Sequence, residues 1–170
     1  YSYLWSDGQT NALATGLSAG QYVCTITDFN GCSTNISVDV HQPTLLTSNE
    51  VSVSHVICFG QSNGSAEVVG VNGTPGYTYS WDNGQTNALA TGLSAGSYVC
   101  TITDDNGCPT NITVQVDQPT ELTSNEVSVS DVSCFGGNDG SAEVEGVDGT
   151  IGGTGYLYLW DNGQTSAQIS

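Results

Sequence analysis

The stretch S-Y-V-C-T-I-T at residues 97–103 decides the fold, because apolar and polar side chains alternate along it. Alternation with a period of two places one set of side chains on each face of a β-strand. Turns that contain glycine flank the stretch, L-S-A-G before it and D-D-N-G after it. We therefore predict a strand within an antiparallel sheet, with Cys100 facing the interior.

Similar alternating runs occur on both sides of this strand. They predict further strands at residues 65–71, 77–81, 111–116 and 126–132, and a short strand within residues 86–93. We find no convincing helix. Several short strands joined by glycine turns are typical of a β-sandwich.

Two local patterns refine the predicted sandwich. Tyr98 and Cys100, which follow a tight turn, resemble the Y-x-C of strand F in an immunoglobulin-like domain, with its tyrosine corner. Trp81 ends the preceding aromatic strand and takes the place of the core tryptophan of strand C. We predict an all-β fold of tandem immunoglobulin-like β-sandwich repeats of about 76 residues.

Internal repetition supports this size. The segment Y-S-Y-L-W at residues 1–5 returns as Y-T-Y-S-W at residues 77–81 and as Y-L-Y-L-W at residues 156–160. Of the first 76 residues, 57 are identical in the next copy. A period of this length indicates an array of similar units.

Prolines mark the predicted boundaries, because Pro43 and Pro119 each follow an alternating run and precede a polar stretch. They predict the C-terminal part of one repeat at residues 1–44, a complete repeat at residues 45–120 and the N-terminal part of a third at residues 121–170. The chain starts and stops within a repeat. Either it is a window on a longer array, or neighbouring chains complete the outer parts.

The charge composition narrows the possible partners. The chain has 17 Asp and Glu residues and no Lys or Arg, which gives a formal net charge of -17. Binding to nucleic acid or to anionic membrane surfaces requires cationic side chains, so we expect neither partner. No apolar run approaches the length of a membrane span. Water, backbone N–H groups or bound cations must therefore compensate the carboxylates.

Three strings carry a family resemblance: C-F-G-G-N-D-G-S-A-E-V at residues 134–144, G-T-P-G-Y-T-Y-S-W-D-N-G-Q-T at residues 73–86, and G-L-S-A-G-S-Y-V-C-T-I-T-D-D-N-G-C at residues 92–108. Together they resemble the SprB-type repeat, which occurs in tandem in very large secreted surface proteins of gliding bacteria, including a gliding adhesin. The resemblance covers essentially the whole unit. It implies export, a cell-surface or fibre location and an adhesive or structural role, without catalytic residues.

Comparison of the copies also argues against an enzyme. His41 corresponds to Asp117 and His55 corresponds to Asp131, so neither histidine recurs from one copy to the next. Without Lys or Arg there is no cationic side chain to stabilise an oxyanion, and no serine has a recurring base as a partner. We therefore expect no catalytic site.

Each repeat contributes three cysteines, and the six are Cys24, Cys32, Cys58, Cys100, Cys108 and Cys134. In the complete repeat, Cys58 and Cys108 should lie at opposite ends of the sandwich, with Cys100 pointing inward between them. A bridge between Cys58 and Cys100 then fits inside the repeat, whereas the family resemblance implies Cys58 with Cys108. A bridge from Cys58 to the turn cysteine of the next repeat is a third possibility. A buried free thiol at Cys100 is a fourth.

Acidic turns are the candidate cation sites, because hard oxygen ligands on glycine turns suit calcium. Asp and Asn also form turns simply by bonding to their own backbone, so the same pattern has a purely structural explanation. The candidate calcium ligands are Asp28, Asn30, Asp82, Asp104, Asp105, Asn106, Asp139 and Asp161.

Asn35 and Asn111 occupy equivalent positions and follow the N-x-S/T rule for glycan acceptors. They should face outward, because the neighbouring Ile36 and Ile112 face the core. Chance occurrence is the simpler interpretation in a chain rich in Asn, Ser and Thr.

These observations predict a non-catalytic structural repeat of an extracellular bacterial surface fibre or adhesin stalk. Its expected partners are neighbouring repeats or copies of itself. One alternative is an adhesin module that binds surface glycans through calcium. A further alternative is a self-assembling filament subunit whose strands are shared between copies.

Overall fold

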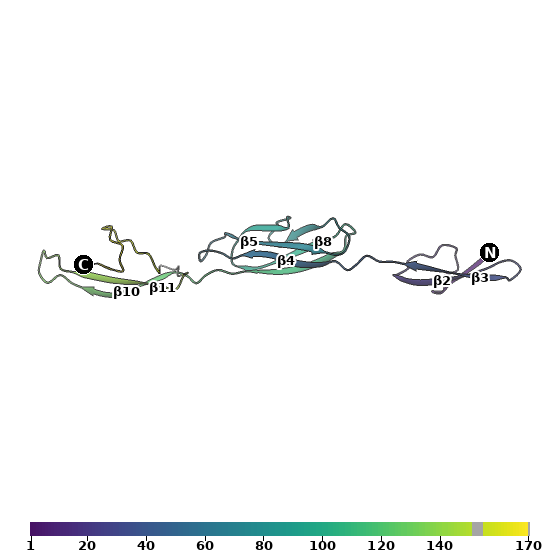
Figure 1. Cartoon of the computed structure of the whole chain (residues 1–170), viewed down its shortest axis with the longest axis horizontal. Coiled ribbons are helices and arrows are strands. Elements are labelled where there is room, and N and C mark those ends of the chain that lie inside the picture. Colours follow the sequence, from purple (N-terminus) through teal and green to yellow (C-terminus); the bar gives the residue numbers. More distant parts are fainter. Residues whose placement is uncertain (151–154, 170) are drawn as a thin grey trace. The chain divides into compact units, whose positions relative to one another are not determined.

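The computed structural model describes residues 1–150 and 155–169, and its strands pair antiparallel (Figure 1). The chain divides into two compact units, Tyr1–Leu45 and Leu46–Ser170. The strands are β1 (Ser2–Trp5), β2 (Gly20–Thr27), β3 (Ser33–Val40), β4 (Thr47–Ser54), β5 (Gly64–Val71), β6 (Thr78–Trp81), β7 (Leu89–Leu93), β8 (Gly96–Thr103), β9 (Pro109–Val116), β10 (Thr123–Ser130), β11 (Ser141–Val147) and β12 (Gln168–Ile169). The predicted all-β class is confirmed.

The first unit is a single three-stranded sheet in the order β1-β2-β3. Its register places Cys24 opposite both Trp5 and Ile36. The Tyr22 hydroxyl donates a hydrogen bond of 3.1 Å to the Ser18 carbonyl and so fixes the turn before β2. Cys24 is the one buried side chain among residues 1–45. The other apolar side chains of this sheet therefore remain at least partly exposed.

Within the second unit, two three-stranded sheets form a sandwich. Their orders are β4-β5-β7 and β6-β8-β9, and β4 and β5 contact β9 while β5 also contacts β8 (Figure 1). The core of this central sandwich consists of Val56, Ala66, Val68, Trp81, Ala90, Leu93, Cys100, Ile102, Val114 and Val116. Both sheets contribute to it, so each covers the apolar face of the other.

The strand quoted at the start of the sequence behaves as its alternation predicts. Cys100 and Ile102 are fully buried, and the Tyr98 hydroxyl donates to the Ser94 carbonyl at 3.1 Å. Trp81 is also buried, and its indole N–H donates to the Asn87 carbonyl at 2.8 Å. These positions agree with the predicted core, whereas the immunoglobulin-like strand assignment stays a prediction.

Gly70 lets the two sheets approach closely. A Cβ at this position would lie 2.9 Å from Cγ of Tyr77 and 3.1 Å from Cγ2 of Ile102. Both distances are shorter than ordinary van der Waals contact. The missing side chain of β5 therefore makes room for one aromatic and one aliphatic side chain of the core.

The last strands form a third sheet, in the order β10-β11-β12. Residues 156–160 repeat the aromatic motif of β1 and β6 but form no strand, and Leu157 and Leu159 are largely exposed. In β1 and β6 the same motif pairs with β2 or β8. The motif therefore needs a neighbouring strand to become one itself. The boundary predicted near Pro119 stays a prediction.

None of the described residues belongs to a helix that is long and apolar enough to cross a membrane.

The mutual cover of the two central sheets can be tested at a pair of equivalent isoleucines. Ile102 is fully buried, whereas Ile26, at the same place in the first unit, is partly exposed. We expect Ile102→Ala to destabilise the central sandwich by about 2–5 kcal/mol, the usual cost of a buried Ile-to-Ala change. Ile26→Ala, the matched control, should cost much less. Thermal unfolding followed by near-ultraviolet circular dichroism measures both, and equal losses would contradict the proposed packing.

Candidate functional site

One end of the central sandwich is organised by a buried carboxylate, and we call it the Asp104 end. Asp104 is 5% exposed. Its Oδ2 accepts the N–H of Thr74 at 3.0 Å, and its Oδ1 accepts the N–H groups of Cys108 at 2.8 Å and Asn106 at 3.1 Å. These bonds hold the pKa of Asp104 below its usual range, and the bond from Thr74 contributes most. The carboxylate joins the turn after β8 to the loop between β5 and β6.

Three other candidate calcium ligands, Asp28, Asp82 and Asp139, lie in separate turns. All three accept a backbone N–H: Asp28 from Cys32 at 2.8 Å, Asp82 from Val99 at 3.0 Å, and Asp139 from Ser133 at 3.0 Å. Hydrogen bonds from Ser133 also lower the pKa of Asp139, and the bond from the Ser133 hydroxyl contributes most.

Asn30 shares the turn of Asp28, and Asp105 and Asn106 share the turn of Asp104, whereas Asp161 follows the third aromatic motif. Across residues 1–150 and 155–169, no group of three or more His, Cys, Asp or Glu side chains is placed to hold a metal ion. The observed bonds are those of turn-forming Asp residues. Calcium binding at these positions stays a prediction.

All six cysteines are free thiols, so the structure contains none of the three predicted pairings. Cys24 and Cys100 are buried, whereas Cys32, Cys58, Cys108 and Cys134 are exposed. Burial raises the pKa of the Cys100 thiol and outweighs the hydrogen bond to the Ser80 backbone, which lowers it. The thiol is therefore held in its neutral, less reactive form.

Within the central sandwich, Cys58 and Cys108 lie at opposite ends, as the sequence predicts. Cys108 directly precedes β9, whereas the loop of Cys58 is tied to the other end of β9 by a 2.9 Å bond from the Val56 N–H to the Asp117 carbonyl. An eight-residue strand spans about 26 Å. A disulfide requires Cα atoms about 4.4–6.8 Å apart, so these two thiols do not meet inside one sandwich.

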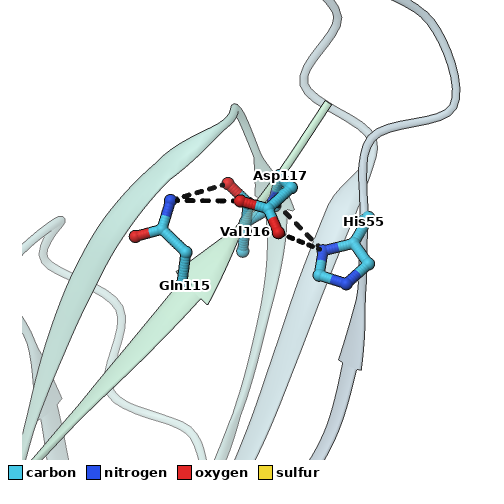
Figure 2. A network of polar contacts seen from close by, with 4 residues as sticks. All are labelled: His55, Gln115, Val116 and Asp117. Carbon is cyan, nitrogen blue, oxygen red and sulfur yellow. Dashed lines mark hydrogen bonds and ion pairs between the residues drawn. The ribbon is translucent and has the colours of Figure 1, made fainter. Parts of the chain in front are cut away.

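The opposite end of the central sandwich, which we call the His55 end, carries a polar contact between the two sheets. The N–H of Asp117 donates to Nδ1 of His55 at 3.1 Å, and a carboxylate oxygen of Asp117 lies 3.9 Å from the same nitrogen. Figure 2 shows the imidazole facing Asp117. The Gln115 side-chain amide donates to the Asp117 carboxylate and to the Val116 carbonyl. Nδ1 of His55 is therefore the hydrogen-bond acceptor in this contact between the sheets.

Sequence reasoning missed this contact because it judged each histidine alone. His55 and Asp117 are 62 residues apart in the chain. The sequence nevertheless contains a signal. At the position of His55 the next copy has an aspartate, Asp131, and at the position of Asp117 the previous copy has a histidine, His41. Two positions that exchange His and Asp in opposite senses are candidates for spatial neighbours.

The two candidate glycan acceptors are equivalent in the structure as well. Asn35 on β3 and Asn111 on β9 are both exposed. Exposure alone does not show that Asn35 faces outward, because its neighbour Ile36 is itself 52% exposed. Glycosylation at both positions stays a prediction.

Because the pKa of Asp104 is lowered by folding, the stability of the sandwich should fall as the pH becomes acidic. Asp104 has a lower pKa in the folded chain than in the unfolded chain, so it stabilises the fold above the ordinary pKa of Asp, and this stability disappears as the pH falls through the folded value. Asp104→Asn should lower the melting temperature at neutral pH by several degrees. The difference from the unmodified chain should shrink as the pH falls below about 4.

The exposed neighbour Asp105 supplies the matched control, since Asp105→Asn removes the same charge one residue away. Melting curves recorded from neutral to acidic pH compare the three proteins. A loss at Asp104 that stays constant over this range, or an equal loss at Asp105, would show that the carboxylate does not act through these bonds.

The comparisons with known proteins agree with the repeat structure. The family model of the SprB repeat matches residues 51–86 and residues 127–165. No curated protein matches the chain. The two matched segments begin at equivalent positions within β4 and β10, and each extends beyond an aromatic Y-x-Y-x-W motif. The chain therefore contains two segments, about one repeat apart, that match the SprB repeat.

Proposed function

We propose that this chain is a non-catalytic, mechanical segment of an extracellular bacterial adhesin or surface fibre. The observation that carries the proposal is the tandem SprB repeat, a repeat of surface-exposed adhesins. Each complete unit then acts as a spacer that holds a distal part of the protein away from the cell. The small sandwich suits this role because its two ends are where the chain enters and leaves.

The direction of the terminal strands supports a mechanical role. Thr47, at the start of β4, pairs with Val71 at the Asp104 end, whereas Val116, at the end of β9, pairs with Gly96 at the His55 end. The chain therefore enters the sandwich at one end and leaves at the other. Tension along the chain acts parallel to β4 and β9, which contact each other. Many side-chain contacts must then be broken together rather than one after another.

The charge of the chain also fits a fibre. With 17 Asp and Glu side chains and no Lys or Arg, neighbouring threads repel each other at short range. At physiological salt this repulsion reaches about 8 Å. Such a surface resists lateral association while it leaves the ends of each sandwich free to contact the next unit. The absence of Lys and Arg also leaves trypsin no cleavage site in this sequence.

Single-molecule force spectroscopy on the chain tests the mechanical role. The sandwich of residues 46–117 should unfold in one step that lengthens the chain by about 22 nm, from roughly 3.5 Å per extended residue less the strand length of the folded sandwich. Ile102→Ala should lower the unfolding force and leave this length unchanged, because the core is weakened while the number of folded residues stays the same. Extension without a resolvable unfolding step would contradict a mechanical role.

A further inference from the structure

Asparagine is followed directly by glycine at six places in this chain, and such a pair can lose the asparagine side-chain amide in water. The six asparagines are Asn30, Asn63, Asn72, Asn83, Asn106 and Asn162. In this reaction the backbone nitrogen of the glycine attacks the side-chain carbonyl carbon of the asparagine, and glycine hinders the attack least because it has no Cβ. Since the dipeptide is the same at all six places, the structure around each pair decides which one reacts.

In four of the six pairs a turn holds the attacking nitrogen. The glycine N–H donates to the backbone carbonyl three residues earlier, at 2.9–3.2 Å, in Gly31, Gly84, Gly107 and Gly163. To attack the asparagine side chain, this nitrogen must first leave its hydrogen bond. The turn therefore has to open before the reaction, which slows it by the free energy of that bond.

The pair Asn63-Gly64 is restrained by its side chain and by packing. The Asn63 side-chain oxygen accepts the N–H of Ile57 at 3.1 Å, and its amide nitrogen donates to the Gln61 side chain at 3.1 Å. Gly64 is buried at the start of β5, where a Cβ would lie 2.8 Å from Cγ1 of Val116. The amide and the backbone of this pair are both held away from the geometry of the reaction.

The pair Asn72-Gly73 lacks these restraints. Within the part of the chain that the structure describes, the Gly73 N–H has no hydrogen-bond acceptor. The Asn72 side chain is exposed, and its one hydrogen bond is a long one, 3.4 Å, to the Thr47 hydroxyl. Asn72 also has a φ of 63°, a left-handed conformation that is strained for a residue with a side chain. This strain raises the free energy of the starting state of the reaction.

The next copy of the repeat shows that the turn accommodates the acid form. Asp148 stands there at the position of Asn72 and has nearly the same φ, 62°. Its carbonyl accepts the Tyr156 hydroxyl at 2.8 Å, as the Asn72 carbonyl accepts the Tyr77 hydroxyl at 2.6 Å. An aspartate at position 72 therefore requires no change in the path of the backbone.

We propose that Asn72 is a deamidation site, at which the folded chain converts an uncharged side chain into a carboxylate without an enzyme. The Gly73 nitrogen bonds to Cγ of Asn72 and loses its proton, and the side-chain amide leaves as ammonia, which closes a cyclic succinimide. Water then adds to one of the two ring carbonyls and breaks its bond to the nitrogen. Addition at Cγ gives aspartate, and addition at the backbone carbonyl gives isoaspartate. The proposal does not depend on the mechanical role proposed above.

The two products affect the Asp104 end differently. Thr74, which follows the reacting pair, donates its N–H to the Asp104 carboxylate at 3.0 Å. Aspartate leaves the backbone path unchanged, so it keeps this bond and the bond from Tyr77 and only adds a charge. Isoaspartate carries the backbone through the Cβ of residue 72, and the added methylene displaces Thr74 from Asp104. Isoaspartate therefore loosens the turn, whereas aspartate does not.

Mass spectrometry of the full chain, incubated at neutral pH in parallel with and without urea, tests the proposal. Proteases that cleave after Glu and after aromatic residues release residues 68–77, which contain Asn72 and no other asparagine. In the folded chain Asn72 should react about two- to tenfold faster than Asn83 and Asn106, the effect of one hydrogen bond on the opening of a turn. In urea the three should react at similar rates. Equal rates in the folded chain, or a slower reaction at Asn72, would overturn the proposal.

Tyr77→Phe tests whether the local structure sets the rate. It removes the bond to the Asn72 carbonyl and should speed the reaction at Asn72 about two- to tenfold, while Asn83 keeps its rate. Tyr79→Phe is the matched control, because it removes a hydroxyl two residues away and should leave both rates unchanged. An equal effect of the two variants, or the same acceleration at Asn83, would contradict control by this bond.

The melting temperature of the separated products tests the predicted difference between them. The Asn72→Asp variant should melt close to the unmodified chain, as the presence of Asp148 in the next copy indicates. The isoaspartate form, separated from an incubated sample by chromatography, should melt at a lower temperature although it has the same charge. Equal melting temperatures of the two products would show that the backbone at position 72 does not support the bond from Thr74 to Asp104.

Discussion

The rest of the structure depends on one interaction: in the central sandwich, each three-stranded sheet covers the apolar face of the other. The chain has no Lys or Arg, so opposite charges contribute little to its stability. Among the described residues the one close approach of a histidine nitrogen to a carboxylate is the exposed contact of His55 with Asp117, at 3.9 Å. Stability must therefore come from the burial of side chains such as Ile102 and Val114, and from backbone hydrogen bonds.

The acidic side chains fit this scheme because backbone N–H groups receive several of their oxygens. Asp104 accepts three such bonds and joins two loops at one end of the sandwich. Asp28, at the equivalent turn of the first sheet, keeps the bond from Cys32. The bond that Asp104 receives from Thr74 comes from the loop that connects β5 of one sheet to β6 of the other. Turn formation and sheet packing are thus linked through a single carboxylate.

Alternation and glycine turns predict the strands, the inward direction of Cys100 and the bond of the Tyr98 hydroxyl, because all three follow from local geometry. The sequence could not show that residues 156–160 remain unpaired, since a strand depends on its neighbour as well as on its own pattern. Nor could single residues reveal the contact of His55 with Asp117, which lie on different sheets. The turn carboxylates illustrate the same limit, because calcium ligands and turn-forming Asp residues have the same sequence pattern.

Hydrogen exchange of the dilute chain tests the central claim most directly, because β2 and β8 have nearly the same sequence and the same paired neighbours. The account predicts that amides of β8 and β9 exchange much more slowly than those of β2 and β3, since a second sheet covers the former alone. Equal protection of the two hairpins would contradict it, because the cover of one sheet by the other would then contribute nothing.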